Sequence, residues 1–135
     1  MKYAVDASVI IDVLREYDPA VALFERLTNE DAELVSSYVI RTEVLAGMRR
    51  GEERATRALL ALIEWAPVGE PESEAAAAFG RRALASNAAI DMADLFLAAV
   101  AERHGAEVLT MNVKHFRELV PDLRAPYSYR GGAES

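Results

Sequence analysis

Hydrophobic residues occur along this chain in two spacings. Short, mainly apolar runs are typical of buried strands, and they lie at residues 3–5, 33–36, 66–68 and 107–110. Between these runs, apolar residues recur every three or four positions, which is the spacing of a helix with one buried face. The predicted helices cover residues 8–15, 18–28, 38–51, 52–65, 72–86, 91–104 and 113–119.

Residues that begin or end helices support these boundaries. Ser8 and Ser37 each precede a periodic stretch and are expected to cap it. Asp18 is expected to be the N-cap of a helix whose first residue is Pro19, and Pro71 opens another helix. Gly105 stands where a helix that follows Asp91 is expected to end.

Strands alternate with helices, which predicts an α/β fold. We expect a three-layer α/β/α sandwich with a mainly parallel central sheet and helices on both faces. The 135 residues suit a single domain over 1–135. The segment from about 121 to 135 is rich in proline and glycine, so we expect a loop or a marginal edge strand and a tail.

Composition excludes several kinds of site. The chain has no cysteine, which removes disulfides, thiolate metal sites and cysteine nucleophiles. No apolar run approaches the roughly 18 residues that span a bilayer, and Asp6 interrupts what would be the apolar part of a signal peptide. We therefore expect a cytoplasmic protein without a membrane segment.

The formal net charge is −7, from 15 Lys and Arg against 22 Asp and Glu. This balance disfavours binding of nucleic acid by the whole surface, because such binding scales with the number of phosphates neutralised. It leaves room for a local basic patch. It also allows a cluster of carboxylates whose charge a bound cation neutralises.

The acidic residues nearest to the predicted strand ends are the strongest candidates for chemistry. Asp6 directly follows the first strand, at the edge where parallel sheets collect reactive groups, although a helix-capping role is the alternative. Glu43 has apolar or small neighbours one helical turn away, so it needs a cation or a partner such as Arg50. Asp91 and Asp94 lie one turn apart at a helix start, where only one of them is needed as a cap.

Carboxylates that meet at one edge of a sheet need a counter-charge. Two charges about 5 Å apart repel by roughly 3 kcal/mol at an effective dielectric constant of 20. An all-oxygen ligand set without cysteine favours Mg²⁺ or Mn²⁺. Such an ion can activate water and stabilise charge on a phosphodiester, so convergence of these acids would indicate metal-dependent phosphoryl chemistry.

Four stretches together give the sequence a family resemblance. In order, they are YAVDASVIIDVL, SSYVIRTEVLAG, IDMADLFLAAVAERHG and VLTMNVKHF, at residues 3–14, 36–47, 90–105 and 108–116. The chain resembles the PIN-domain family, and within it the VapC-type ribonuclease toxins of bacterial toxin–antitoxin pairs. That resemblance implies a PIN-like fold and endonucleolytic cleavage of RNA. It also implies an acidic pocket for Mg²⁺, which Mn²⁺ can replace.

The resemblance assigns roles to individual residues. Asp6, Glu43 and Asp94 occupy the positions of the family's three acids. Asp6 and Asp94 would hold the ion, whereas Glu43 would orient or deprotonate the attacking water or join the metal shell. Supporting or substrate-positioning roles are expected for Ser8, Asp91 and Asn112; many relatives have Asp at the last of these positions. Candidate contacts with RNA phosphates are Arg41, Arg49, Arg50, Lys114 and Arg117.

Other residues near the motifs receive more ordinary interpretations. His115 is expected at the surface or facing RNA, and Asp12 is expected to be structural. Tyr38, Trp65 and Phe96 could stack on bases, but their helical spacing favours core or interface positions.

The resemblance further implies RNA as the substrate, a homodimer, and an inhibitory antitoxin that packs over the active-site groove. The helix predicted over 52–65 is a plausible surface for either protein partner.

Three alternatives remain at this point. A receiver-like signalling domain would need an acidic pair after the first strand, but Asp6 is single. A phosphatase of the haloacid dehalogenase type would need an acid where Ser8 stands. A non-catalytic interaction module with the PIN fold is the third, and Asn112 is the departure that favours it.

Overall fold

The computed structural model describes residues 1–86 and 91–129. The strands are β1 (Lys2–Val5), β2 (Glu33–Ser37), β3 (Glu64–Ala66) and β4 (Glu107–Leu109). The helices are α1 (Ala7–Leu14), α2 (Asp18–Asn29), α3 (Tyr38–Ala46), α4 (Glu53–Leu60), α5 (Glu70–Ala85), α6 (Met92–His104) and α7 (Val113–Phe116).

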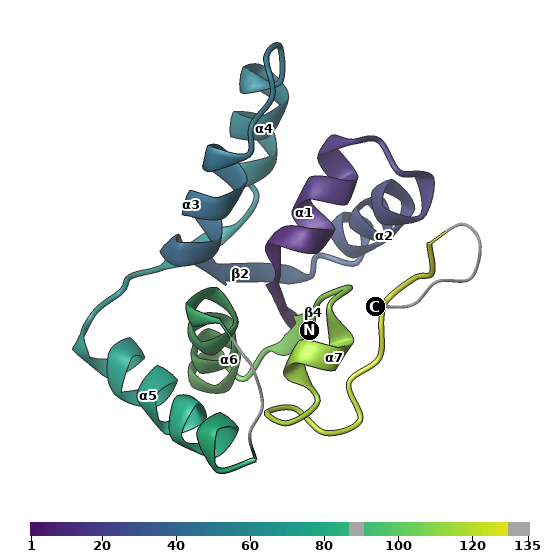
Figure 1. The fold of residues 1–135 in the computed structure, drawn as a ribbon. Coiled ribbons are helices and arrows are strands. Elements are labelled where there is room, and N and C mark those ends of the chain that lie inside the picture. Colours follow the sequence, from purple (N-terminus) through teal and green to yellow (C-terminus); the bar gives the residue numbers. More distant parts are fainter. Residues whose placement is uncertain (87–90, 130–135) are drawn as a thin grey trace.

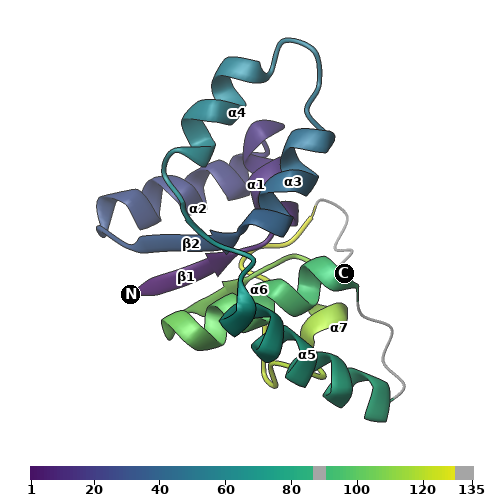
Figure 2. The same ribbon diagram turned by 90° about the vertical axis from the view of Figure 1, so that its left-hand side faces the viewer.

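The four strands form one parallel sheet in the order β3-β2-β1-β4. Helices α1 to α4 lie on one side of the sheet and α5 to α7 on the other (Figures 1 and 2). The predicted three-layer α/β/α sandwich with a parallel sheet is therefore confirmed. Because all strands run the same way, the residues that follow β1, β2 and β4 meet at one edge of the sheet.

Helix α6 forms the centre of one layer. It packs against β1, β2 and β4 on one side and against α5 on the other. Its buried residues lie all around its axis, as expected for a helix enclosed between a sheet and a second helix. They are Ala93, Asp94, Phe96, Leu97, Ala98, Ala99, Val100 and Ala101. An ionisable group at the start of this helix is therefore held in a rigid setting.

Several predicted helix boundaries are confirmed. The Ser37 hydroxyl accepts a hydrogen bond from the Val39 N–H at 3.0 Å, so it caps α3. Pro71 lies in the first turn of α5. Gly105 ends α6 with φ of 61°, a left-handed conformation that favours glycine.

The predicted caps of the first two helices are wrong. Asp6, and not Ser8, is the N-cap of α1, because the Asp6 carboxylate accepts the Ala7 N–H at 2.8 Å. Asp18 is the first residue of α2, and the N-cap is Tyr17. The proline after Asp18 lies in the first turn of the helix in both the prediction and the structure. Only the N-cap differs, by one residue.

The helix predicted to continue to residue 51 ends earlier. Helix α3 ends at Ala46 with Gly47 as its C-cap. After it, the Glu52 carboxylate accepts the Arg49 N–H at 2.7 Å and closes a turn before α4. A turn therefore separates the two helices, which the sequence predicted to adjoin at residues 51 and 52.

The helix predicted over 52–65 is also shorter than expected. Its last turns are replaced by an irregular segment and by β3. This strand begins two residues earlier than the predicted strand 66–68. Trp65 pairs with Ser36 in the sheet, and its indole N–H donates to the Leu60 carbonyl at 2.9 Å. Sheet pairing at this edge overrides the helical periodicity of the sequence.

Residues 121–129 of the tail contain no helix or strand, which agrees with the predicted loop, whereas residues 130–135 lie outside the described chain. The Tyr127 and Tyr129 hydroxyls donate to the Asp12 carboxylate at 2.6 and 2.7 Å. The Tyr17 hydroxyl donates to the Ser128 carbonyl at 2.7 Å. Asp12 therefore anchors the tail to α1, which fits the structural role expected for it. Across the described residues, no helix is long and apolar enough to cross a membrane.

Replacing Tyr127 with Phe should lower stability by about 1–2 kcal/mol, because one charge-assisted hydrogen bond to Asp12 is lost. Tyr3→Phe is the matched control and should change stability little, since within the described residues the tyrosine hydroxyls that form hydrogen bonds are those of Tyr17, Tyr127 and Tyr129. Chemical denaturation of both variants gives the comparison. Equal stabilities would show that the tail contributes nothing through this contact.

Candidate active site

The end of β1 positions Asp6. Its backbone N–H donates to the Leu109 carbonyl at 2.9 Å, which extends the pairing of β1 with β4 by one residue. The side chain then turns to cap α1 and is 3% exposed. The sequence offered a helix cap and a reactive group at the sheet edge as alternatives for Asp6. In the structure Asp6 caps α1 and also lies at the sheet edge.

Two hydroxyl groups also bind the Asp6 carboxylate. Its Oδ2 atom accepts from the Thr110 hydroxyl at 2.6 Å and from the Ser8 hydroxyl at 3.1 Å. Burial raises the pKa of Asp6, whereas these hydrogen bonds and the Ala7 N–H act in the opposite direction because they stabilise the anion.

Thr110 is a site residue that the sequence reasoning missed. The sequence predicts it only as the last residue of a strand. The pairing of that strand with β1, which places Thr110 beside Asp6, is visible only in the structure. Thr110 is fully buried.

The first turn of α6 positions the second pair of acids. The Asp91 carboxylate accepts the Asp94 N–H at 3.0 Å and caps the helix, so Asp94 is free for another role. Asp94 is 4% exposed, and its buried Oδ2 atom has no hydrogen-bond partner among residues 1–86 and 91–129. Burial and the negative charges of Asp91 and Asp6 raise the pKa of Asp94 to about 7.

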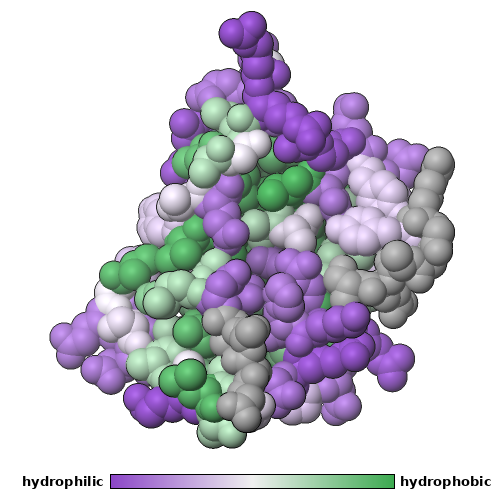
Figure 3. Space-filling model, viewed as in Figure 1, coloured by the Kyte–Doolittle hydropathy of each residue, from purple (hydrophilic) through white to green (hydrophobic). Residues whose placement is uncertain are grey.

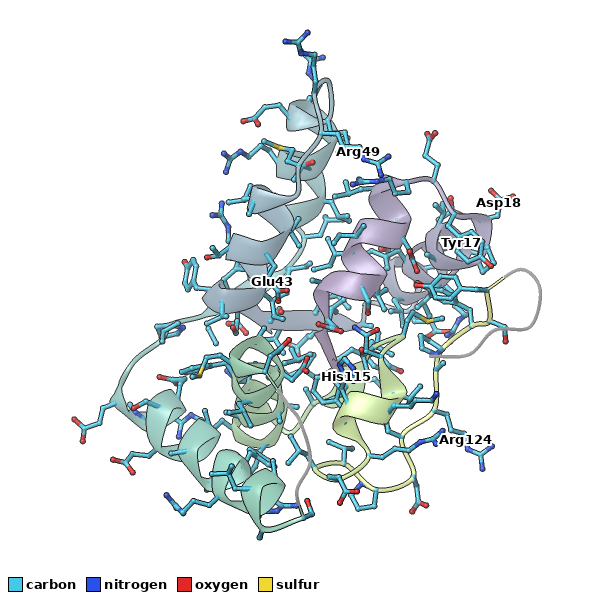
Figure 4. The ribbon with its side chains drawn as sticks, viewed as in Figure 1. Tyr17, Asp18, Glu43, Arg49, His115 and Arg124 are labelled. Atoms are coloured by element: carbon cyan, nitrogen blue, oxygen red, sulfur yellow. The ribbon has the colours of Figure 1, made fainter. Side chains whose placement is uncertain are left out.

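Glu43 approaches the same edge from the second layer of helices. It is exposed on α3, and burial of part of its surface and the charges of Asp6 and Asp91 raise its pKa. The charges that act on Glu43 are thus negative, and the alternative pairing with Arg50 is not found in the structure. Figure 4 shows Glu43 pointing toward the region between α1 and α6.

The structure therefore brings together four carboxylates from three separate parts of the sequence. Each of Asp6, Glu43 and Asp94 is affected by the charge of another member of this group. Figure 3 shows hydrophilic side chains gathered near the middle of the same face, with hydrophobic ones around them. We call Asp6, Glu43, Asp91 and Asp94 the acidic cluster.

The donors in the acidic cluster suit a hard divalent cation. All are carboxylate oxygens, and the unpartnered Oδ2 of Asp94 is the kind of buried atom that needs a cation or a donor. Among the described residues, no group of three or more His, Cys, Asp or Glu side chains is close enough to hold an ion by itself. An ion here would therefore be held by few carboxylates and would keep several waters, as Mg²⁺ commonly does.

His115 lies next to Asp94. Its Nδ1 atom is 3.6 Å from the Asp94 Oδ2 atom, which is too long for a hydrogen bond. More than half of the His115 side chain is exposed, which agrees with the expected surface position. Asn112 precedes α7, and its backbone N–H donates to the Thr110 hydroxyl at 2.9 Å.

The expected basic contacts fall into two groups. Lys114 and Arg117 are exposed on and after α7, in the same segment as His115. Arg49 and Arg50 are exposed in the turn between α3 and α4, and Arg41 is half-buried on α3. Figure 4 places Arg49 beyond the end of α3 that lies farther from Glu43.

The three aromatic candidates differ in position. Phe96 is buried in α6 and belongs to the core, as its helical spacing favoured. Tyr38 is 47% exposed and its ring centroid lies 6.5 Å from that of Trp65. These two rings lie on α3 and β3. Of the three aromatic candidates, they are the two with exposed surface that could stack on a base.

Comparison with known proteins adds three findings. The PIN domain family matches residues 3–120. Ribonuclease VapC19 of Mycobacterium tuberculosis is 35% identical over 123 residues, which cover 91% of this chain and 98% of the relative. Ribonuclease VapC10 of the same organism is 32% identical over 129 residues, or 94% of each chain.

Solved structures show the same fold. VapBC2 from Rickettsia felis bound to a promoter DNA fragment superposes with a TM-score of 0.74 at 17% identity, covering 93% of this chain and 97% of the other. A toxin–antitoxin complex from Klebsiella pneumoniae gives 0.72 at 22% identity, with 93% and 98% coverage. FitAcB from Neisseria gonorrhoeae gives 0.71 at 26% identity, with 86% and 91% coverage.

Proposed function

This chain belongs to the PIN-domain family as a homologue of the VapC ribonuclease toxins, and we propose that it is a Mg²⁺-dependent endoribonuclease, the toxin of a toxin–antitoxin pair. Membership of this family removes the receiver-like and phosphatase alternatives. The acidic cluster is the observation that carries the proposal of metal-dependent chemistry. A fold that gathers four carboxylates, and in its described part gives a buried Asp94 oxygen no hydrogen-bond partner, is suited to a bound cation.

In the proposed site, Asp6 and Asp94 hold the cation from two adjacent elements. When bound, Mg²⁺ supplies positive charge next to the scissile phosphate and lowers the pKa of an attacking water. Asp6 is held rigidly by its hydrogen bonds, so it offers a fixed ligand position. Asp94 contributes an oxygen to which no donor of the described residues is hydrogen-bonded.

Glu43 is the proposed proton acceptor. It is exposed, so substrate and water can reach it, and its raised pKa brings it closer to neutral pH. Its carboxylate would orient the attacking water and take its proton. Asp91 holds the start of α6 in place and adds negative charge, and Ser8 and Asn112 support the ends of the neighbouring segments.

Exposed cations near the acidic cluster would bind RNA phosphates. Lys114 and Arg117 share a segment with His115, which contacts the acidic cluster, so they are the nearer candidates. Arg41, Arg49 and Arg50 would extend the contact along α3. A small basic rim on an acidic protein gives weak, salt-sensitive binding, so recognition would depend on RNA shape and unpaired bases.

Two protein partners are part of the proposal. Solved structures with this fold include toxin–antitoxin complexes, which supports a cognate antitoxin for this chain. Large apolar side chains that are exposed, and so available for contact with a second copy, include Tyr38, Leu62, Val68, Leu84 and Met92. We propose a cytoplasmic homodimer that the antitoxin inhibits.

The direct test is cleavage of single-stranded RNA by the purified chain. We expect internal cuts with Mg²⁺ or Mn²⁺, no cuts with excess EDTA, and recovery when Mn²⁺ is added back beyond the chelator. Product ends mapped by sequencing distinguish internal cuts from trimming. A chain that binds Mn²⁺ and leaves a broad set of RNAs intact would instead support the non-catalytic interaction module.

A further inference from the structure

Backbone groups fix the direction of two hydroxyl protons beside Asp6. The Asn112 N–H donates to the Thr110 hydroxyl oxygen at 2.9 Å, and the Met111 N–H donates to the Ser8 hydroxyl oxygen at 3.0 Å. A hydroxyl has one proton and two acceptor positions. Each hydroxyl oxygen therefore accepts from the backbone, and the nearest acceptor for each proton is the Asp6 carboxylate, at 2.6 Å from Thr110 and 3.1 Å from Ser8, whereas the two hydroxyl oxygens lie 3.5 Å apart.

These contacts occupy most of the Asp6 carboxylate. An ionised carboxylate offers about four acceptor positions, two on each oxygen. The Thr110 and Ser8 hydroxyls take both positions on Oδ2, and the Ala7 N–H takes one on Oδ1. Among the described residues no further donor binds this carboxylate, so one position, on Oδ1, is left for a cation.

Thr110 makes the shortest of these contacts, at 2.6 Å, and links two segments 104 residues apart in the sequence. Its own position is fixed because it is fully buried and follows β4 next to β1. Ser8, by contrast, lies in the first turn of α1, the helix that Asp6 caps. Its hydroxyl lies farther from the Asp6 Oδ2 atom, at 3.1 Å.

We propose that Thr110 is a positioning residue that orients Asp6 as a ligand with a single open position for the divalent cation. This inference rests on the proposed metal-dependent function. Thr110 touches neither the ion nor the RNA in this arrangement. It acts through Asp6, by occupying Oδ2 so that Oδ1 presents the binding position.

The test is Mn²⁺ affinity of Thr110→Val, measured by calorimetry or by paramagnetic resonance of free Mn²⁺, without RNA. Loss of a hydrogen bond to a metal ligand commonly costs roughly 10- to 100-fold in affinity, and we expect a loss in this range. Thr110→Ser keeps the hydroxyl and should bind Mn²⁺ within about threefold of the parent chain. If Thr110→Val binds Mn²⁺ as tightly as the parent, the proposal is wrong.

Thr56→Val is a matched control for the loss of a buried hydroxyl. Thr56 is fully buried, and its hydroxyl has no hydrogen-bond partner in the described part of the chain, so its replacement should leave Mn²⁺ affinity unchanged. Thr110→Val also removes the acceptor of the Asn112 N–H, so circular dichroism and thermal unfolding of each variant check the fold. If Thr110→Val fails to fold, Thr110→Ala and Ser8→Ala carry the comparison, and a larger loss of Mn²⁺ affinity in Ser8→Ala than in Thr110→Ala would overturn the proposal.

RNA cleavage supplies a second measurement. If Thr110 only positions Asp6, saturating Mn²⁺ should restore most of the kcat of Thr110→Val, whereas a general structural defect would persist at every metal concentration. A kcat that stays low when Mn²⁺ saturates the site would contradict the positioning role. Because Mn²⁺ affinity is measured without substrate, failure of RNA cleavage in the parent chain and failure of this inference are separate results.

Discussion

Replacing Asp94 with Asn should reduce RNA cleavage on the order of a thousandfold, because a Lewis-acid cation supplies several kcal/mol and each 1.4 kcal/mol corresponds to about tenfold in rate. The amide keeps the shape of the side chain and removes the anionic ligand. Asp6→Asn should have a similar effect, since it removes the other proposed ligand. Initial rates on one labelled RNA, with Mn²⁺ varied, measure both variants.

Asp18→Asn is the matched control for these variants. Asp18 is exposed at the start of α2, and Figure 4 shows it on the side of the molecule away from α6. The same change of charge should therefore leave cleavage close to that of the parent chain. Retained cleavage in both Asp6→Asn and Asp94→Asn would mean that a contaminant cuts the RNA or that the site is elsewhere.

The fold could be predicted because its periodicities are unambiguous where they matter. Buried strands alternate with helices along the chain, and this alternation predicts a parallel sheet even where the exact strand limits are wrong. The errors lie at the edge, where β3 replaces the last turns of a predicted helix. There, pairing of Trp65 with Ser36 decides the structure, and local spacing carries no information about a partner 29 residues away in the sequence.

The sequence allowed the acidic residues of the site to be predicted, but it did not reveal the hydrogen bonds that hold them. Acids after a strand or at a helix start are visible in the sequence, and the structure brings Asp6, Glu43 and Asp94 within each other's electrostatic influence. Thr110 was missed because a threonine at the end of a strand is already explained by its β propensity. Only the register of β1 with β4 reveals that its hydroxyl reaches Asp6.

The same charges that suit a cation should destabilise the protein without one. The pKa of Asp94 is about 7 in the folded protein, above its ordinary value of 3.8, so the folded state binds this proton more tightly than the unfolded state. Stability therefore falls as pH rises from about 4 to 7 and changes little through this group at higher pH. The pKa values of Asp6 and Glu43 are also raised, which acts in the same direction.

We therefore expect the metal-free protein to melt several degrees higher at pH 5 than at pH 8. At pH 8, Asp94→Asn should raise the Tm of the metal-free protein, because the amide carries no charge to be repelled by Asp91 and Asp6. Mn²⁺ at one hundred times its Kd should add about 2.7 kcal/mol to the parent chain. That corresponds to a rise of roughly 10 °C for a chain of this size.

Differential scanning calorimetry with EDTA or Mn²⁺ at pH 5 and pH 8 separates these effects. Asp94→Asn should lose most of the rise that Mn²⁺ gives the parent chain, whereas Asp18→Asn should keep it and show no gain in the absence of metal. A metal-free Asp94→Asn protein that melts several degrees below the parent would mean that Asp94 stabilises the fold as an anion. The repulsion within the acidic cluster, and with it the need for a cation, would then be disproved, because Asp91 already supplies the cap of α6.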